Sequence, residues 1–253
     1  MRVENSFIPV RGVGEKTERA LWRAGITHWD DFERAAVGPV TAERIASFVA
    51  VAREHLAAGD ARFFEGVLPS GERWRLYENF REEACFFDIE TTGLDASHAN
   101  ATTVSVHRAG ETATLVRGED LTADALRRVF DDAALLVSYN GARFDVPFLE
   151  QEFGLRIDRP HLDLMYPCRR LGLMGGLKAV EREVGIERDS TGLSGRDAIE
   201  LWHAHERGED GALDSLIAYN RDDTVNLRAL AEIVAERLHE AVFETVRASG
   251  DDP

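Results

Sequence analysis

The chain has little cysteine and no long apolar run, and both absences narrow the class of protein. Of its 253 residues only Cys85 and Cys168 are cysteines, too few for a disulfide framework or a cysteine-rich metal site. We therefore expect a reducing, cytoplasmic location, with Cys85 as a small core hydrophobe. No stretch reaches the roughly 20 apolar residues of a membrane span. The opening MRVENSFIPV lacks the basic-then-apolar layout of a secretory signal, so we expect no membrane association.

Lysine is nearly absent as well. The chain has 30 basic and 46 acidic residues, a net charge of −16, and only Lys16 and Lys178 are lysines. A lysine-poor, carboxylate-rich surface is typical of halophilic proteins; the alternative is a merely acidic protein from a GC-rich genome. The charge disfavours long-range attraction to nucleic acid at ordinary salt. In molar salt the Debye length is only about 3 Å, so short-range contacts decide binding and a nucleic-acid substrate is not excluded.

The order of the apolar patterns divides the chain. Residues 9–58 predict short helices separated by glycine turns, among them GPVTAERIASFVAVAREHL and a helix beginning at THWDDFERA. From residue 83 the pattern changes to strands, then to alternating strands and helices, and ends in helices. This order is typical of an α/β fold, a mixed sheet flanked by helices. We expect a small all-α domain at 1–62, a linker at 63–82, the α/β domain at 83–245 and a tail at 246–253.

The stretch CFFDIETTGL places two carboxylates at the end of a buried strand. Because residues i and i+2 of a strand point to the same face, Asp88 and Glu90 project together and Ile89 points away. Two adjacent carboxylates repel each other, and one takes up a proton unless a positive charge lies between them. A strand that ends at Asp88 and exposes both acids in a loop explains this pair equally well.

Two further segments carry acids. SYNGARFDVPFL puts Asp145 at the start of a helix, where an N-cap is the ordinary explanation, and Asn140 in a turn. In the last long helix an apolar stripe includes Tyr219 and Asp223. A carboxylate on a core-facing stripe needs a partner, since leaving it ionised and alone costs several kcal/mol. Tyr219 lies one turn before Asp223, although a core tyrosine is its ordinary reading.

Divalent metal ions are the natural partners of these acids. Four ionised carboxylates carry −4 and two Mg²⁺ or Mn²⁺ ions carry +4, so a closed two-metal site is nearly neutral. All-oxygen ligands suit such hard cations rather than zinc. Two ions about 4 Å apart stabilise both the attacking and the leaving oxygen of a phosphoryl displacement. An arginine that neutralised the cluster instead would count against this interpretation.

The acidic segments resemble the three motifs of the DEDD superfamily of exonucleases. FDIETTGL, SYNGARFDVPFL and YNRDDTVNL match the order D-x-E, N-x-x-x-x-D and Y-x-x-x-D. The tyrosine four residues before the last aspartate is similar to the DEDDy subgroup, which includes the proofreading domains of family B DNA polymerases. The helical segments between the second and third motifs resemble the YprB-type branch. The resemblance covers roughly Cys85 to Leu238 and implies a ribonuclease-H-like fold and a metal-dependent 3′–5′ exonuclease.

The resemblance also implies roles for single residues. Asp88, Glu90 and Asp223 would bind the first metal ion, and Asp88 with Asp145 the second. Tyr219 would orient or help deprotonate the attacking water. The following side chains would contact the substrate: Thr91, Leu94 and Asn140 at the terminal nucleotide, Phe144 by stacking on a base, and Lys178 at a backbone phosphate. For Lys178, a solvated helix residue is an equal alternative.

The N-terminal segment resembles the helix-hairpin-helix domain of archaeal recombinases, on VRGVGEKTERALWRAGITHWDDFERA and GPVTAERIASFVAVARE. This resemblance implies that Gly12, Gly14 and Lys16 contact a nucleic-acid backbone at a helix N-terminus. Such domains also serve as docking surfaces for proteins.

We expect a two-metal 3′–5′ exonuclease acting on single-stranded DNA, with RNA as the alternative substrate. A selective endonuclease on the same site and a non-catalytic nucleic-acid-binding protein are the competing hypotheses, because a fold alone does not decide access to its site.

Overall fold

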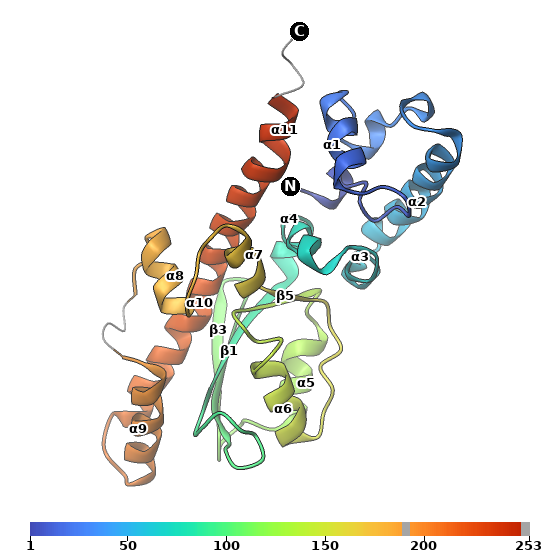
Figure 1. Ribbon diagram of the computed structural model, residues 1–253. Helices are drawn as coiled ribbons and strands as arrows, with labels where there is room; N and C mark the ends of the chain where they lie inside the picture. Colours follow the sequence, from blue (N-terminus) through green and yellow to red (C-terminus); the bar gives the residue numbers. More distant parts are fainter. Residues whose placement is uncertain (189–192, 249–253) are drawn as a thin grey trace. The chain divides into compact units, whose positions relative to one another are not determined.

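The structure is a computed structural model that describes residues 1–188 and 193–248 (Figure 1). The chain divides into two compact units. Unit 1 combines residues 1–81 with the C-terminal segment from Glu232, and unit 2 comprises residues 82–231. None of the described helices is both long enough and apolar enough to cross a membrane.

Unit 2 is built on a five-stranded mixed sheet with the strand order β3-β2-β1-β4-β5. The strands β1, β2 and β3 pair antiparallel, whereas β1, β4 and β5 run parallel. The strands are β1 Ala84–Thr91, β2 Ala101–Arg108, β3 Glu111–Val116, β4 Leu135–Ser138 and β5 His161–Asp163. The helices are α5 Ala123–Asp131, α6 Asp145–Phe153, α7 Met165–Arg170, α8 Leu177–Val184, α9 Gly195–Glu206 and α10 Ala212–His239, whose residues from Glu232 onward belong to unit 1. The expected α/β class, a mixed sheet flanked by helices, is confirmed.

The two faces of β1 pack against different helices. Phe87 and Ile89 belong to an apolar core with side chains of α5 and α6, among them Phe130 and Phe148. Figure 1 shows α5 and α6 on one side of the sheet and α10 on the other. Because side chains alternate along a strand, Asp88 and Glu90 face the side on which α10 lies.

Parallel pairing brings three strand ends to one edge of the sheet. Phe86 of β1 pairs with Val137 of β4, and Ser138 of β4 pairs with Asp163 of β5. The carboxyl ends of parallel strands lie at the same edge, which is where open α/β sheets bind their ligands. The acids of β1 and the turn that follows β4 therefore meet there although about 50 residues separate them in sequence.

Unit 1 is helical. Its α-helices are α1 Glu15–Arg23, α2 Pro39–Ala57, α3 Ala61–Val67, α4 Tyr77–Phe80 and α11 Thr245–Ala248. Its 3₁₀ helices are Val3–Asn5, Trp29–Asp31, Arg34–Ala36 and Ser70–Leu76, a further 3₁₀ turn at Arg81–Glu83 precedes β1, and Glu240–Glu244 is a π-helix. The spacing of Ile45, Phe48, Val49 and Ala52 predicts one apolar face for α2, and the structure buries Ile45, Val49 and Ala52 and half-buries Phe48.

The prediction of a helix beginning at THWDDFERA is wrong. These residues form two short 3₁₀ helices instead. One Asp31 carboxylate oxygen accepts the backbone N–H groups of Thr27 and His28, and the His28 ring caps the N–H of Asp30. Such local bonds between side chain and backbone compete with a continuing helix and close the turn.

The linker expected at 63–82 also differs from the structure. These residues form helices and belong to unit 1, where Phe64, Trp74 and Phe80 are buried. The segment from Glu232 joins the same unit through Phe243, whose ring lies 5.1 Å from that of Trp22. The aromatic side chains of both segments therefore serve a core rather than a connection. Of the expected tail, residues 246–248 lie in α11 and residues 249–253 lie outside the described part.

The helix-hairpin-helix is not confirmed. Before Gly14, which caps α1, the described residues contain only the three-residue 3₁₀ helix Val3–Asn5 and turns. Gly12 does adopt the left-handed conformation expected of a tight glycine turn, with φ of +94°.

A buried ion network holds the N-terminal residues of unit 1 to the helices that follow. The Arg75 side chain is 1% exposed, and its guanidinium donates to Glu18 and to Glu72. Glu18 also accepts the backbone N–H groups of Phe7 and Ile8. Each buried charge is thus compensated by an opposite charge and by hydrogen bonds, the condition under which burial is tolerated.

We predict that Arg75→Met destabilises unit 1 by about 3–5 kcal/mol, because it removes the buried cation that pairs with the Glu18 and Glu72 carboxylates. Urea unfolding followed by tryptophan fluorescence measures this loss, since three of the four tryptophans lie in unit 1. The control is Arg19→Met, which breaks only the exposed pair with Glu15 and costs less than about 1 kcal/mol. Equal effects of the two substitutions would contradict this account of the network.

Candidate active site

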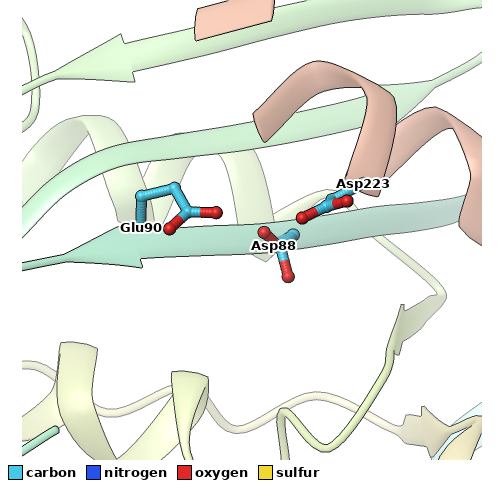
Figure 2. Close-up of side chains that lie close together, drawn as sticks. All are labelled: Asp88, Glu90 and Asp223. Atoms are coloured by element: carbon cyan, nitrogen blue, oxygen red, sulfur yellow. The ribbon is translucent and has the colours of Figure 1, made fainter. Parts of the chain in front are cut away.

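Three carboxylates from two elements converge on one point. Asp88 and Glu90 of β1 and Asp223 of α10, here called the three-acid group, each place an oxygen within 4.8 Å of the others. Figure 2 shows the three side chains gathered between the strand and the helix. The predicted strand alternation and the predicted helical stripe are both present, since Ile89 is in the core and Asp223 is 6% exposed.

Asn220 fixes α10 to the strands, and sequence reasoning missed it. This fully buried side chain accepts a hydrogen bond from Thr103 on β2 and donates one of 2.8 Å to Asp88. Thr103 stands opposite Glu90 in the β1–β2 register. Asn220 lies three residues before Asp223, on the same side of the helix, so the helical periodicity alone could have singled it out.

The three-acid group is electrostatically strained. Burial, followed by repulsion from Asp223, raises the pKa of both Asp88 and Glu90 well above the ordinary range. Burial also raises the pKa of Asp223, although Arg188 and Lys178 act in the opposite direction. In the structure as it stands, the nearby cations do not compensate the charge of the three acids.

Asp145 lies beside this group rather than within it. It is the first residue of α6, as the sequence predicted, and is 5% exposed. Its charge acts on Asp88 and on Glu90. Burial raises the pKa of Asp145 to about 7, although hydrogen bonds from its own backbone N–H and that of Ile89 favour the ionised form.

The turn that precedes Asp145 is held by a second residue that sequence reasoning missed. Asp163, at the end of β5 and 5% exposed, accepts the backbone N–H groups of Asn140, Ala142 and Met165. Asn140 itself has a left-handed backbone with φ of +66°. A side chain at Gly141 would come within 2.2 Å of the Ser138 hydroxyl, so only glycine fits there. The signal for Asp163 was present in the sequence, because it is an acid at the end of a short apolar strand.

Tyr219 and Lys178 meet at the edge of the three-acid group. Tyr219 is 3% exposed and packs with Leu216 and Trp202. The Lys178 ammonium donates a hydrogen bond of 2.6 Å to the Tyr219 hydroxyl and lies 4.0 Å from the centroid of its ring. Burial lowers the pKa of Lys178, whereas the Asp223 carboxylate favours its charged form. The structure therefore places Lys178 at the site and not on a solvated helix face.

Arg188 pairs with Asp223, and an arginine that neutralised the whole cluster would count against a metal site. Its guanidinium forms one ion pair with Asp223 and another with Glu181. Asp88, Glu90, Asp145, Asp223 and Glu181 carry five negative charges when ionised, against two positive charges from Arg188 and Lys178. Burial is the largest cause of the raised pKa values of Asp88 and Glu90, and the deficit means that the nearby cations do not offset it. The arginine compensates one acid and leaves the cluster short of positive charge.

The remaining predicted substrate residues lie in different surroundings. Thr91 adjoins Glu90, is buried, and donates its hydroxyl to the backbone of Gly93. Leu94 is 87% exposed. Phe144 is half-buried against the core, with its ring 5.6 Å from that of Phe148. Gly12, Gly14 and Lys16 belong to unit 1, and the structure assigns them no place relative to this site.

The donor set fits hard divalent cations. All the ligand atoms are carboxylate oxygens, they are close together, and Glu90 and Asp223 are buried. Mg²⁺ and Mn²⁺ prefer oxygen ligands and would supply the missing positive charge.

Comparison with known proteins agrees with this fold. The family described as the RNase_H superfamily matches residues 85–235. No curated protein matches the sequence. Among solved structures, the chain is similar to a family B DNA polymerase from the hyperthermophilic archaeon Pyrobaculum calidifontis, with 19% identity and a TM-score of 0.47 over 66% of this chain and 26% of the polymerase. A structure titled "apo form of the nuclease" has 21% identity and a TM-score of 0.44 over 66% of this chain and 79% of its own. At these TM-scores neither likeness bears on activity.

The raised pKa values predict how the metal-free protein responds to pH. An acid whose pKa is higher in the folded state binds more protons there, so stability falls as pH rises. The fall begins near the ordinary carboxyl pKa values, 3.8 for aspartate and 4.5 for glutamate, and continues as the pH rises through the folded-state pKa of each acid, which is about 7 for Asp145. We expect Glu90→Gln to stabilise the metal-free protein at pH 8 by about 1–3 kcal/mol and to have little effect at pH 4. Urea unfolding in EDTA at both pH values measures this.

The control for this prediction is Glu183→Gln, on the exposed side of α8, which should change stability by less than about 0.5 kcal/mol at either pH. A Glu90→Gln protein that is less stable than the parent at pH 8 would contradict the repulsion.

Proposed function

The chain belongs to the RNase H superfamily, and from this premise we propose that it is a metal-dependent 3′–5′ exonuclease of the DEDDy type that hydrolyses phosphodiester bonds of single-stranded DNA. One observation supports the proposal above the others: three carboxylates with raised pKa values, Asp88 and the buried Glu90 and Asp223, lie within 4.8 Å of one another on two elements that carry the motifs. Such a cluster is costly to keep in a core unless cations use it.

Two divalent ions, Mg²⁺ or Mn²⁺, would supply the charge that stabilises the attacking and leaving oxygens of the displacement. In this proposal Asp88, Glu90 and Asp223 hold the first ion, and Asp88 and Asp145 hold the second. Asn220 holds the Asp88 carboxylate in place through its hydrogen bond, so that this acid can serve both ions.

The surroundings of Tyr219 keep its hydroxyl protonated, which limits its part in catalysis to orienting the attacking water. Burial, followed by the Asp223 carboxylate, raises the pKa of the Tyr219 hydroxyl, so the group stays protonated at neutral pH. A protonated hydroxyl beside the acids orients the attacking water by hydrogen bonding and does not remove its proton. Lys178 keeps this hydroxyl in position by donating to it.

The substrate end in this proposal is a displaced single strand, with RNA as the alternative. Thr91, Leu94 and Asn140 would line the terminal nucleotide, and Phe144 would stack on a base. Lys178 would add a contact to a backbone phosphate.

Unit 1 would contact the nucleic-acid backbone through Gly12, Gly14 and Lys16. Lys16 lines a hollow of about 360 Å³ together with Arg19, Arg23 and Glu15. The hollow is thus lined by three cations and one acid, which is unusual in a chain of net charge −16 and supports a phosphate contact on this helix. Docking of a protein partner on unit 1 is the competing proposal.

The direct test of activity is digestion of single strands labelled at either end. With Mg²⁺ or Mn²⁺ we expect a ladder of products shortened from the 3′ end, and none with EDTA or with Asp223→Asn. The matched control is Asp222→Asn, which removes the neighbouring charge outside the three-acid group and should keep activity within about twofold of the parent. Internal fragments would favour an endonuclease, and retarded but intact strands a binding protein.

If Tyr219 orients the attacking water, its loss should lower the reaction rate without weakening metal binding. Tyr219→Phe removes only the hydroxyl, so we expect kcat to fall by about 10²-fold, the lower range for acid–base and positioning groups, with little change in metal binding. Single-turnover digestion and Mn²⁺ binding measured in parallel test this. An unchanged kcat, or a loss of Mn²⁺ binding equal to that of Asp223→Asn, would contradict the orienting role.

A further inference from the structure

Arg188 joins two buried acids that have different places in the site. One end of its guanidinium pairs with Asp223, a member of the three-acid group, and the other end pairs with Glu181 on α8. The Arg188 side chain is 12% exposed and that of Glu181 is 1% exposed. The metal site proposed above gives neither Glu181 nor Arg188 a role.

The contact to Asp223 competes with the chemistry expected of that residue. A carboxylate that gives an oxygen to a guanidinium has less freedom to coordinate a cation, and the positive charge of the guanidinium repels an arriving ion. The contact to Glu181 does not compete, because Glu181 lies outside the three-acid group. A planar guanidinium with several N–H donors can release one carboxylate and keep the other.

Lys178, a second cation near the three-acid group, differs from Arg188 in its contacts. Its ammonium donates to neutral oxygens, the Tyr219 hydroxyl and the backbone carbonyl of Leu193. Its charge acts on Asp223 and Glu90 through space, without an ion pair to either. Among the residues that the structure describes, the ion pairs of the three-acid group come to Arg188 alone.

We propose that Arg188 is a displaceable counter-ion: it pairs with Asp223 while the site is free of metal, releases Asp223 when divalent cations bind, and remains held by Glu181. This inference rests on the proposed metal-dependent function. It explains why the chain keeps a fifth acid, Glu181, buried beside the cluster. Without this second acid, the released guanidinium would be left in a half-buried site with no partner, which is costly.

The test measures Mn²⁺ binding to the full chain without nucleic acid, by calorimetry and by the electron paramagnetic resonance signal of free Mn²⁺. Arg188→Gln removes the competitor, and we expect Mn²⁺ to bind about tenfold tighter, equivalent to about 1.4 kcal/mol. Lys178→Gln removes a positive charge from the same surroundings without removing an ion pair, so we expect a change of only about twofold. Equal changes of Mn²⁺ affinity in the two variants would mean that Arg188 acts only through its charge, and would overturn the proposal.

Glu181 tests the second half of the proposal through a double-mutant cycle. Glu181→Gln leaves Arg188 with Asp223 as its remaining acid, so Mn²⁺ binding should weaken by about fivefold. In the Arg188→Gln background the same substitution should change binding by less than about twofold, because there is no arginine to retain. An undiminished effect in that background would overturn the retention by Glu181.

Mn²⁺ binding to two further variants, Arg188→Lys and Asp223→Asn, separates failure of this inference from failure of the proposed function. Arg188→Lys keeps the charge but cannot span both acids, so it should also bind Mn²⁺ more tightly than the parent even if Arg188→Gln folds poorly. Asp223→Asn should abolish binding at the first site. If the parent itself binds no Mn²⁺, the proposed metal-dependent function fails together with this inference. If the parent binds and Asp223→Asn does not, but neither Arg188 variant exceeds Lys178→Gln, only the counter-ion inference fails.

Discussion

Repulsion among buried carboxylates is the constraint around which unit 2 is arranged. Asp88 and Glu90 share one face of β1, and α10 brings Asp223 against them. Each of these acids would be more stable ionised in water, and each has its pKa raised by burial. The fold therefore holds these charges together against their own electrostatics, using the hydrophobic packing of β1 and α10 on either side of them.

The polar residues around the acids limit this strain without removing it. Asn220 gives Asp88 one hydrogen bond, and Arg188 compensates Asp223. Asp163 holds the turn from which Asp145 enters α6, so the fourth acid is positioned by a group that accepts only backbone N–H bonds. These hydrogen bonds and ion pairs are directional and fix the positions of the acids, yet the deficit of positive charge remains. Under the metal-dependent function proposed above, this deficit is a cost in stability that serves cation binding, a common trade in functional sites.

In unit 1, features that depend on the spacing of apolar residues could be predicted from the sequence, whereas features that depend on side-chain hydrogen bonds or on distant contacts could not. The helix α2 and its buried face followed from the spacing of apolar residues. The 3₁₀ turns at Trp29 and Arg34 did not, because the Asp31 side chain bonds to the backbone locally and ends the helix that the spacing indicated. The segment 63–82 was predicted as a linker because it is charged and aromatic and because Pro69 and Gly71 indicate a turn. Those aromatic residues pack within unit 1, which also includes the segment from Glu232 at the far end of the chain.

For the site, the sequence by itself determined that Asp88 and Glu90 share a face if the strand includes both, and that Asp223 lies on an apolar helical stripe, since both depend only on local backbone geometry. The structure extends β1 to Thr91 and so removes the alternative in which both acids lie in a loop. Only the tertiary structure decided that these faces meet, that Asp145 stands beside the group rather than in it, and that Arg188 and Glu181 share the site. The physical reason is that parallel pairing of β1 with β4 and the packing of α10 on the sheet join residues separated by up to 135 positions, from Asp88 to Asp223. No local pattern carries that information.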